Sequence, residues 1–176
     1  MSRRLWIGLA AVLAVAIAVY WFGFRQKTVE ADVEVPILAA AIGEGEEAVG
    51  VAGNGAVVRW LPPPEDPPLP RLPLDEVPKG GKVRGTALEQ VLVLAAVPDE
   101  LRPYVESSFF GESGVDVTLT TGIELRFGDA SQARRKWRAA AAVLADPSVT
   151  ALDYVDLHAP SRPAYGGSEH ELPAAP

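Results

Sequence analysis

The chain has 176 residues, a length that suits a single domain. Its 16 basic and 23 acidic side chains give a formal net charge of −7, which argues against nucleic-acid binding because a phosphate backbone requires basic patches. The chain contains no cysteine, so disulfide frameworks and thiolate sites are excluded.

An uncharged apolar run occupies residues 5–24. Twenty residues at about 1.5 Å each span about 30 Å, the thickness of a bilayer core. The run is longer than the 7–15-residue core of a cleaved secretory signal, which is the alternative reading. We therefore predict a cytoplasmic stub at 1–4, a transmembrane helix at 5–24, a juxtamembrane linker at 25–32 and an extracytoplasmic domain beyond. The short N-terminal tail and the acidic region after the span favour this orientation.

The first part of the expected domain carries strand signals. Residues 33–41 are apolar with Pro36 inside, which is typical of an edge strand or a strand start. Two further apolar runs, 48–52 and 56–60, flank Asn54-Gly55, and this dipeptide is a strong hairpin signal. A hairpin is therefore expected here.

A proline-rich segment follows at residues 62–73, with seven prolines in twelve residues. We expect it to be extended, without ladder hydrogen bonds, and to act as a stiff connector. A ligand for a proline-recognising domain is the alternative. Thr86 and Glu89 then form a capping-box pattern that predicts a helix to about residue 96.

The C-terminal third alternates strand and helix patterns. Residues 115–119 and 123–127 predict a hairpin around Gly122. Apolar residues at helical spacing over 133–144 predict an amphipathic helix, and 151–157 predict the last strand. We expect the domain to cover 33–165 and a disordered tail to cover 166–176.

These elements define an α+β fold in which two main helices pack on a mostly antiparallel sheet. The predicted core comprises Val57, Leu92, Val117, Leu119, Leu125, Phe127, Trp137, Leu144 and Val155.

Candidate catalytic and metal-binding groups are sparse. His158 and His170 are the only histidines, and their spacing without cysteine makes a poor metal site. Asp153 and Asp156, three apart on one strand, would point to opposite faces, so they cannot form an acid–base pair. Ser161 has no nucleophile motif around it. We predict no catalytic residue, no metal and no cofactor, and therefore no enzyme.

Two surfaces remain as candidate binding sites. Arg134, Arg135 and Arg138, with Lys136, form a basic run that we interpret as the solvated face of a helix; the alternative is a docking patch for an acidic partner or anionic headgroups. The last strand, if it lies at the sheet edge, invites strand addition by another chain. The prolines that follow it could equally blunt that edge.

Five segments between residues 34 and 165 resemble one known family in order and spacing. They are Val35-Pro36-Ile37, the hairpin at 50–58, the segment 69–74, the run Gly122-Ile123-Glu124-Leu125-Arg126-Phe127-Gly128 and the run Asp153-Tyr154-Val155-Asp156-Leu157. Together with the N-terminal anchor they resemble the extracytoplasmic β domain of the bacterial cell-division family FtsQ/DivIB. The family's POTRA domain is missing, since only residues 25–32 stand in its place.

The resemblance implies a non-catalytic, single-pass divisome scaffold in the cell membrane at the septum. Its partners would be bitopic coiled-coil proteins of the FtsB and FtsL type. Carried over by motif, the partner-binding residues are Tyr154, Val155, Asp156, Leu157, His158, Ala159, Pro160, Ser161, Arg162 and Tyr165. The alternative function is a membrane-anchored ligand-binding or sensory module with a pocket between sheet and helices.

Overall fold

The computed structural model describes residues 36–172. The expected cytoplasmic stub, transmembrane helix and linker lie outside this range, so they stay predictions. Within the described residues, no helix is both long enough and apolar enough to cross a membrane.

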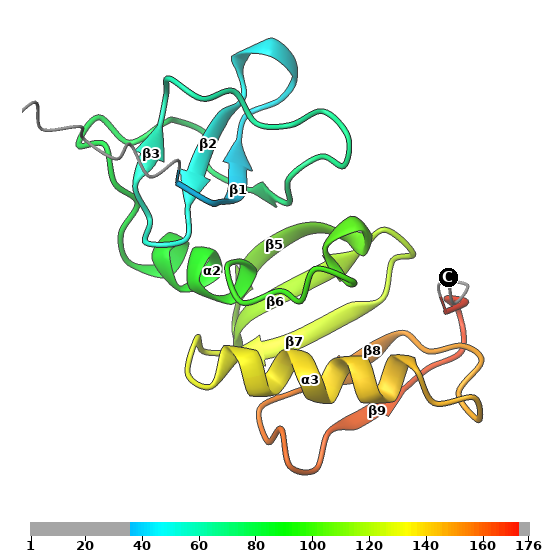
Figure 1. Ribbon diagram of the computed structural model, residues 1–176. Coiled ribbons are helices and arrows are strands. Elements are labelled where there is room, and N and C mark those ends of the chain that lie inside the picture. Colours follow the sequence, from blue (N-terminus) through cyan, green and yellow to red (C-terminus); the bar gives the residue numbers. More distant parts are fainter. Residues whose placement is uncertain (1–35, 173–176) are drawn as a thin grey trace, which may run out of the picture. The chain divides into compact units, whose positions relative to one another are not determined.

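The described part of the chain forms a sheet of nine strands with two α-helices (Figure 1). In chain order the elements are β1 (Leu38–Ile42), β2 (Val49–Ala52), β3 (Val57–Val58), β4 (Arg71–Leu72), α2 (Thr86–Leu94), β5 (Val105–Gly111), β6 (Gly114–Leu119), β7 (Glu124–Gly128), α3 (Ala133–Leu144), β8 (Tyr154–Asp156) and β9 (Ala164–Gly166). The strands lie side by side in the order β3-β2-β1-β4-β5-β6-β7-β8-β9.

The α+β class is confirmed, but the sheet is mixed where we expected it to be mostly antiparallel. The pairs β1–β4, β4–β5 and β7–β8 are parallel, and the other neighbours are antiparallel. The pairing of β7 with β8 follows from α3, because a helix that returns the chain along the sheet makes the next strand parallel to the previous one.

Both helices cover one face of the sheet, and Trp137 joins them in the core. Its indole Nε1 donates a hydrogen bond of 2.9 Å to the carbonyl of Val93 in α2. Its ring lies 4.9 Å from the ring of Phe127 on β7, at an angle of 52°. The Trp137 side chain therefore ties α3 both to α2 and to the sheet.

Most of the predicted core is confirmed. Val117, Leu119, Leu125, Phe127, Trp137 and Val155 are fully buried, whereas Val57 and Leu144 are partly buried and pack against the core. The prediction that Leu92 belongs to the core is wrong, since its side chain is 40% exposed. The buried side of α2 carries Ala87, Gln90, Val91, Val93 and Leu94, and at 3.6 residues per turn Leu92 lies on the opposite side.

The two predicted hairpins are confirmed as β2–β3 and β6–β7. The proline-rich segment differs from our expectation because it contains β4, which pairs with β1 and β5. Arg71 and Leu72 are not prolines and keep their backbone N–H groups, so this dipeptide can pair as a strand. The carbonyl of the preceding Pro70 also takes part, since it accepts a hydrogen bond of 2.9 Å from the N–H of Ala41 in β1.

The predicted capping box is wrong. Thr86 is the first helical residue of α2, and Gly85, with φ +59°, occupies the capping position without any side-chain cap. The Glu89 carboxylate instead accepts a hydrogen bond of 2.9 Å from the backbone N–H of Ala130, before α3. A tertiary contact has thus replaced the local one.

The tail is ordered further than predicted. Gly166 lies in β9, and Glu171 forms a bridge with Ala151. The carbonyl of His170 accepts a hydrogen bond of 2.9 Å from the N–H of Leu152. Residues 166–172 therefore do not form the disordered tail that we expected, because the chain after β9 pairs with the segment before β8.

Candidate partner-binding edge

The predicted last strand is not at the edge of the sheet. β8 lies between β7, which it pairs with in parallel, and β9, which it pairs with antiparallel. Residues 158–163, which we expected to leave the sheet, turn the chain back so that β9 becomes the terminal strand (Figure 1). Strand addition at β8 is therefore blocked by the protein's own chain.

The predicted partner-binding residues consequently divide into three groups. Val155 and Leu157 are fully buried and belong to the core. Tyr154, Asp156 and Pro160 are half-buried. The exposed members are His158, Ala159, Ser161, Arg162 and Tyr165, of which Tyr165 alone lies in the edge strand.

The hydrogen bonds of β8 show which backbone groups of β9 are free. Glu124 N–H donates to the Asp153 carbonyl, and Leu157 N–H donates to the Arg126 carbonyl, each at 2.9 Å. Alternate residues of a strand present their backbone groups to opposite sides. The carbonyl of Asp153 and the backbone groups of Val155 and Leu157 therefore face β7, and those of Tyr154 and Asp156 face β9. At the start of β8 the chain is irregular, since the N–H of Asp153 donates to the Gly166 carbonyl of β9 at 2.8 Å.

Tyr154 pairs with Gly166, Val155 with Tyr165 and Asp156 with Ala164. Since the first and last of these are the hydrogen-bonded pairs, the N–H and C=O of Tyr165 point away from β8. They face the outer side of the sheet, where the described residues place no further strand. The Tyr165 side chain is 47% exposed beside them.

The other end of the sheet is covered. Beside β3, Val57 N–H donates to the Gly81 carbonyl and Val83 N–H donates to the Gly55 carbonyl, each at 2.9 Å. Ala56 also bridges to Lys82. The loop before α2 thus closes the β3 edge, whereas β9 is left open among residues 36–172.

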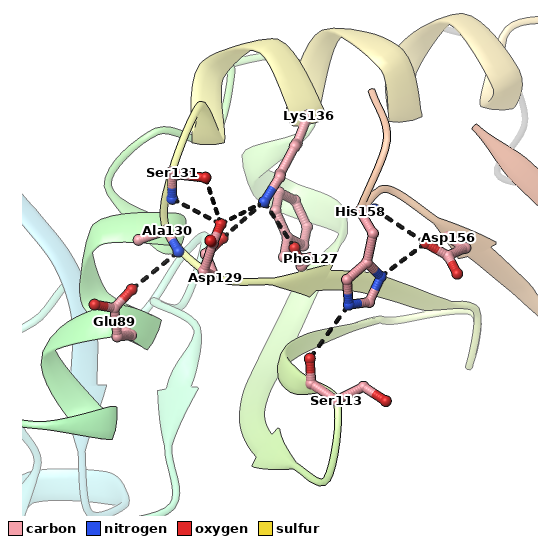
Figure 2. A network of polar contacts seen from close by, with 9 residues as sticks. All are labelled: Glu89, Ser113, Phe127, Asp129, Ala130, Ser131, Lys136, Asp156 and His158. Carbon is pink, nitrogen blue, oxygen red and sulfur yellow. Dashed lines mark hydrogen bonds and ion pairs between the residues drawn. The ribbon is translucent and has the colours of Figure 1, made fainter. Parts of the chain in front are cut away.

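Behind the edge, His158 fastens the end of β8 to the β5–β6 turn (Figure 2). Its Nδ1 lies 2.8 Å from Asp156 Oδ1, and its Nε2 lies 3.3 Å from the backbone carbonyl of Ser113. The hydrogen bond to Asp156 raises the pKa of His158. Because Nε2 contacts a carbonyl and not the Ser113 hydroxyl, this Asp–His–Ser arrangement activates no nucleophile.

Gly128 makes room for the His158 ring. A Cβ on Gly128 would lie 2.6 Å from His158 Cδ2, and Gly128 also has φ +73°. Gly128 is thus required for two reasons: its backbone conformation favours glycine, and a side chain at this position would collide with the His158 ring.

The neighbouring basic run separates into a buried and an exposed part. Lys136 is 3% exposed, and its Nζ donates to the Phe127 carbonyl (2.8 Å), the Asp129 carbonyl (3.0 Å) and Asp129 Oδ1 (2.7 Å) (Figure 2). The hydrogen bonds from Lys136 and Ser131 lower the pKa of Asp129 to about 2. Lys136 is thus a structural residue that joins α3 to the end of β7.

Arg134, Arg135 and Arg138 are exposed on α3, as both interpretations of the basic run require. Arg135 Nη1 donates a hydrogen bond of 3.3 Å to Oε1 of Gln132, the residue directly before α3. No acidic side chain among the described residues forms an ion pair with these three arginines, so the solvated-face and docking-patch interpretations both stay open.

The face of the sheet opposite the helices carries charged groups near the edge. Arg126 Nε lies 2.6 Å from Glu124 Oε1, and Arg126 Cζ lies 4.3 Å from the centre of the Tyr154 ring, over which the guanidinium stacks. Asp116 is 6% exposed, and the described residues offer no hydrogen-bond partner to its Oδ1. Burial, followed by repulsion from Glu124, raises the pKa of Asp116.

Sequence reasoning missed Ala164 and Gly166 as edge-strand residues. A three-residue strand between Pro163 and Gly167 carries almost no periodicity, and the only local signal is the pair of turn-forming residues that bound it.

No protein-family model matches the chain, and no curated protein matches its sequence. The FtsQ/DivIB resemblance therefore rests on the motifs in the sequence.

Proposed function

We propose that this protein is a membrane-anchored, non-catalytic scaffold of the bacterial divisome that binds a bitopic partner by strand addition at β9. The observation that carries the proposal is the contrast between the two ends of the sheet. The β3 edge is closed by residues 81–83, whereas the backbone of Tyr165 in β9 faces outward with no partner strand among the described residues.

The position of β9 refines the surface expected from the resemblance. Val155 and Leu157 support the edge from the core and do not reach a partner. Contact falls instead to the outward backbone of Tyr165 and its exposed ring. Main-chain pairing of this kind supplies affinity, and adjacent side chains supply specificity.

The free edge is short, which sets the scale of the interaction. β9 has three residues, Pro163 before it has no N–H, and Gly167 after it has φ +92°. Few ladder bonds can form there, so we expect the partner to add side-chain contacts. Arg162 and the ring of Tyr165 are exposed on β9 or directly before it, and are available for such contacts.

Two variants of one residue test the proposal. Tyr165→Pro removes the outward N–H, and the ladder to β8 is preserved because that N–H is not used there. Tyr165→Ala removes the ring and keeps the N–H. The assay is binding of the full-length chain in mild detergent to FtsB- and FtsL-type proteins from the same cells, with circular dichroism as the check on folding.

We expect Tyr165→Pro to weaken binding about tenfold or more, since it removes one hydrogen bond and leaves a partner carbonyl unsatisfied. Tyr165→Ala should also weaken binding but should retain the main-chain component. A folded Tyr165→Pro variant with the affinity of Tyr165→Ala would show that β9 is not the docking strand.

A second function, a ligand-binding module, is favoured by one observation. A cavity of about 400 Å³ lies beside β4 and β5 and is lined in part by Arg71, Leu74 and Ser107. Its walls come from strands and loops and not from the helices, so it differs from the pocket we expected. Arg71 forms ion pairs there with Glu44 and Glu106. Thermal stabilisation by a small acidic metabolite, lost in Arg71→Ala, would support this function.

A further inference from the structure

We infer that Asp153, Glu169 and His170 form a binding site for one divalent transition-metal ion. A carboxylate oxygen of each acidic residue and a ring nitrogen of His170 all lie within 4.8 Å of one another. In the sequence the only other histidine is His158, which makes a poor metal site with His170, whereas the structure places His170 beside the carboxylates of Asp153 and Glu169.

The backbone holds these three residues together. Asp153 N–H donates to the Gly166 carbonyl at 2.8 Å, and Leu152 N–H donates to the His170 carbonyl at 2.9 Å. The Glu169 N–H donates to Asp153 Oδ1 at 2.7 Å. The segment before β8 and the segment after β9 are thus already paired where the donors converge, so metal binding requires little ordering of the chain.

The three side chains do not satisfy one another. Among the described residues, the structure records no hydrogen bond or ion pair that joins any two of these side chains. Two carboxylates at this separation repel each other unless a cation lies between them. Within the described residues no ion pair joins the His170 ring to either carboxylate, so the three donors are spaced more widely than ligands already bound to an ion, and side-chain rotation is needed to bring them onto it.

Two glycines leave space for the donors. A Cβ on Gly167 would lie 2.1 Å from Asp153 Oδ2, and a Cβ on Gly122, in the β6–β7 turn, would lie 2.7 Å from His170 Cε1. Both glycines also have φ above +90°, at +92° and +91°. Any other residue at either position would displace a donor side chain.

The donor set selects the type of metal. Two carboxylates neutralise a divalent charge, and an imidazole nitrogen suits Zn²⁺, Co²⁺ or Ni²⁺, whereas Ca²⁺, Mg²⁺ and Mn²⁺ prefer oxygen ligands. Bonds of about 2.1 Å at a tetrahedral angle place neighbouring ligand atoms about 3.4 Å apart. Rotation of the exposed Glu169 side chain, together with rotation of the half-buried His170 or Asp153 side chain, would bring the donors to that spacing. Water would complete the coordination.

The ion would fasten the chain after β9 to the start of β8. This consequence does not rest on the proposed partner binding, since the site can be measured without any partner. It does predict that metal reduces the exposure of the backbone from 164 to 172 to hydrogen exchange.

The test uses the full-length chain in mild detergent, without an oligohistidine tag and stripped of metal with a chelator. Zn²⁺ is titrated by calorimetry, and Co²⁺ is titrated by visible absorption, which reports the coordination geometry of the bound ion. We expect one equivalent to bind, with a rise in Tm and a clear preference over Ca²⁺ and Mg²⁺.

The chain offers a matched control. His170→Gln should weaken Zn²⁺ binding by at least the 10–100-fold typical of losing an outer-shell group, whereas His158→Gln, at the only other histidine, should leave it unchanged. Glu169→Gln, at an exposed position that tolerates the change, should weaken it similarly even if His170→Gln folds poorly. Equal binding by Glu169→Gln and the unaltered chain, or no saturable binding of Zn²⁺, would overturn the site.

Discussion

Replacing Lys136 with Met should destabilise the domain although the residue lies in a basic run on an amphipathic helix. Met keeps the buried stem of the side chain and removes the ammonium group, which makes three hydrogen bonds. Asp129 is 67% exposed and can be solvated again, so its ion pair contributes no more than about 1 kcal/mol. The buried Phe127 carbonyl loses a charged donor, and the Asp129 carbonyl loses another, at about 1.5 kcal/mol or more each. The two lost donors together give an expected loss of at least about 3 kcal/mol.

The measurement is urea unfolding of the full-length chain in mild detergent, followed by far-ultraviolet circular dichroism. The midpoint should fall without a change in slope, since the surface exposed on unfolding is the same. Arg138→Met is the matched control, because Arg138 is exposed on the same helix, and its effect should stay within about 0.5 kcal/mol. If Lys136→Met and Arg138→Met unfold at the same urea concentration, Lys136 belongs to the surface patch and the argument for its structural role fails.

Three further predictions concern the same domain. Trp137→Phe should cost about 2–4 kcal/mol, because it removes the bond to Val93 and leaves a cavity, and a small shift in the urea midpoint would contradict that role. Asp129 has a folded pKa of about 2, below its unfolded value near 4, so its contribution is complete above pH 4 and is lost as pH falls through 2; Asp129→Asn should flatten the acid side of the stability profile in this window. Leu92→Ala should cost less than about 1 kcal/mol, since the side chain is 40% exposed, and a core-sized loss would mean that another surface covers it.

Local patterns in the chain were sufficient to predict the element types and much of the core. The Asn54-Gly55 turn, the β6–β7 alternation and the apolar face of α3 each depend on neighbours a few residues apart, so they can be read without knowing the fold. The buried Trp137 and Phe127 followed from the same periodicity. These predictions are confirmed because a large apolar side chain on a periodic face has no other place to be buried.

Only the tertiary structure decided the position of the sheet edge and the role of Lys136. β9 is too short to show a pattern, and it forms because β8 offers a row of backbone groups that residues 164–166 can reach after the connection 157–163. Lys136 looks like its exposed neighbours in the sequence, but the carbonyls that bind it come from the end of β7. The convergence of Asp153, Glu169 and His170 has the same origin, since their proximity depends on pairing between segments that no local rule connects.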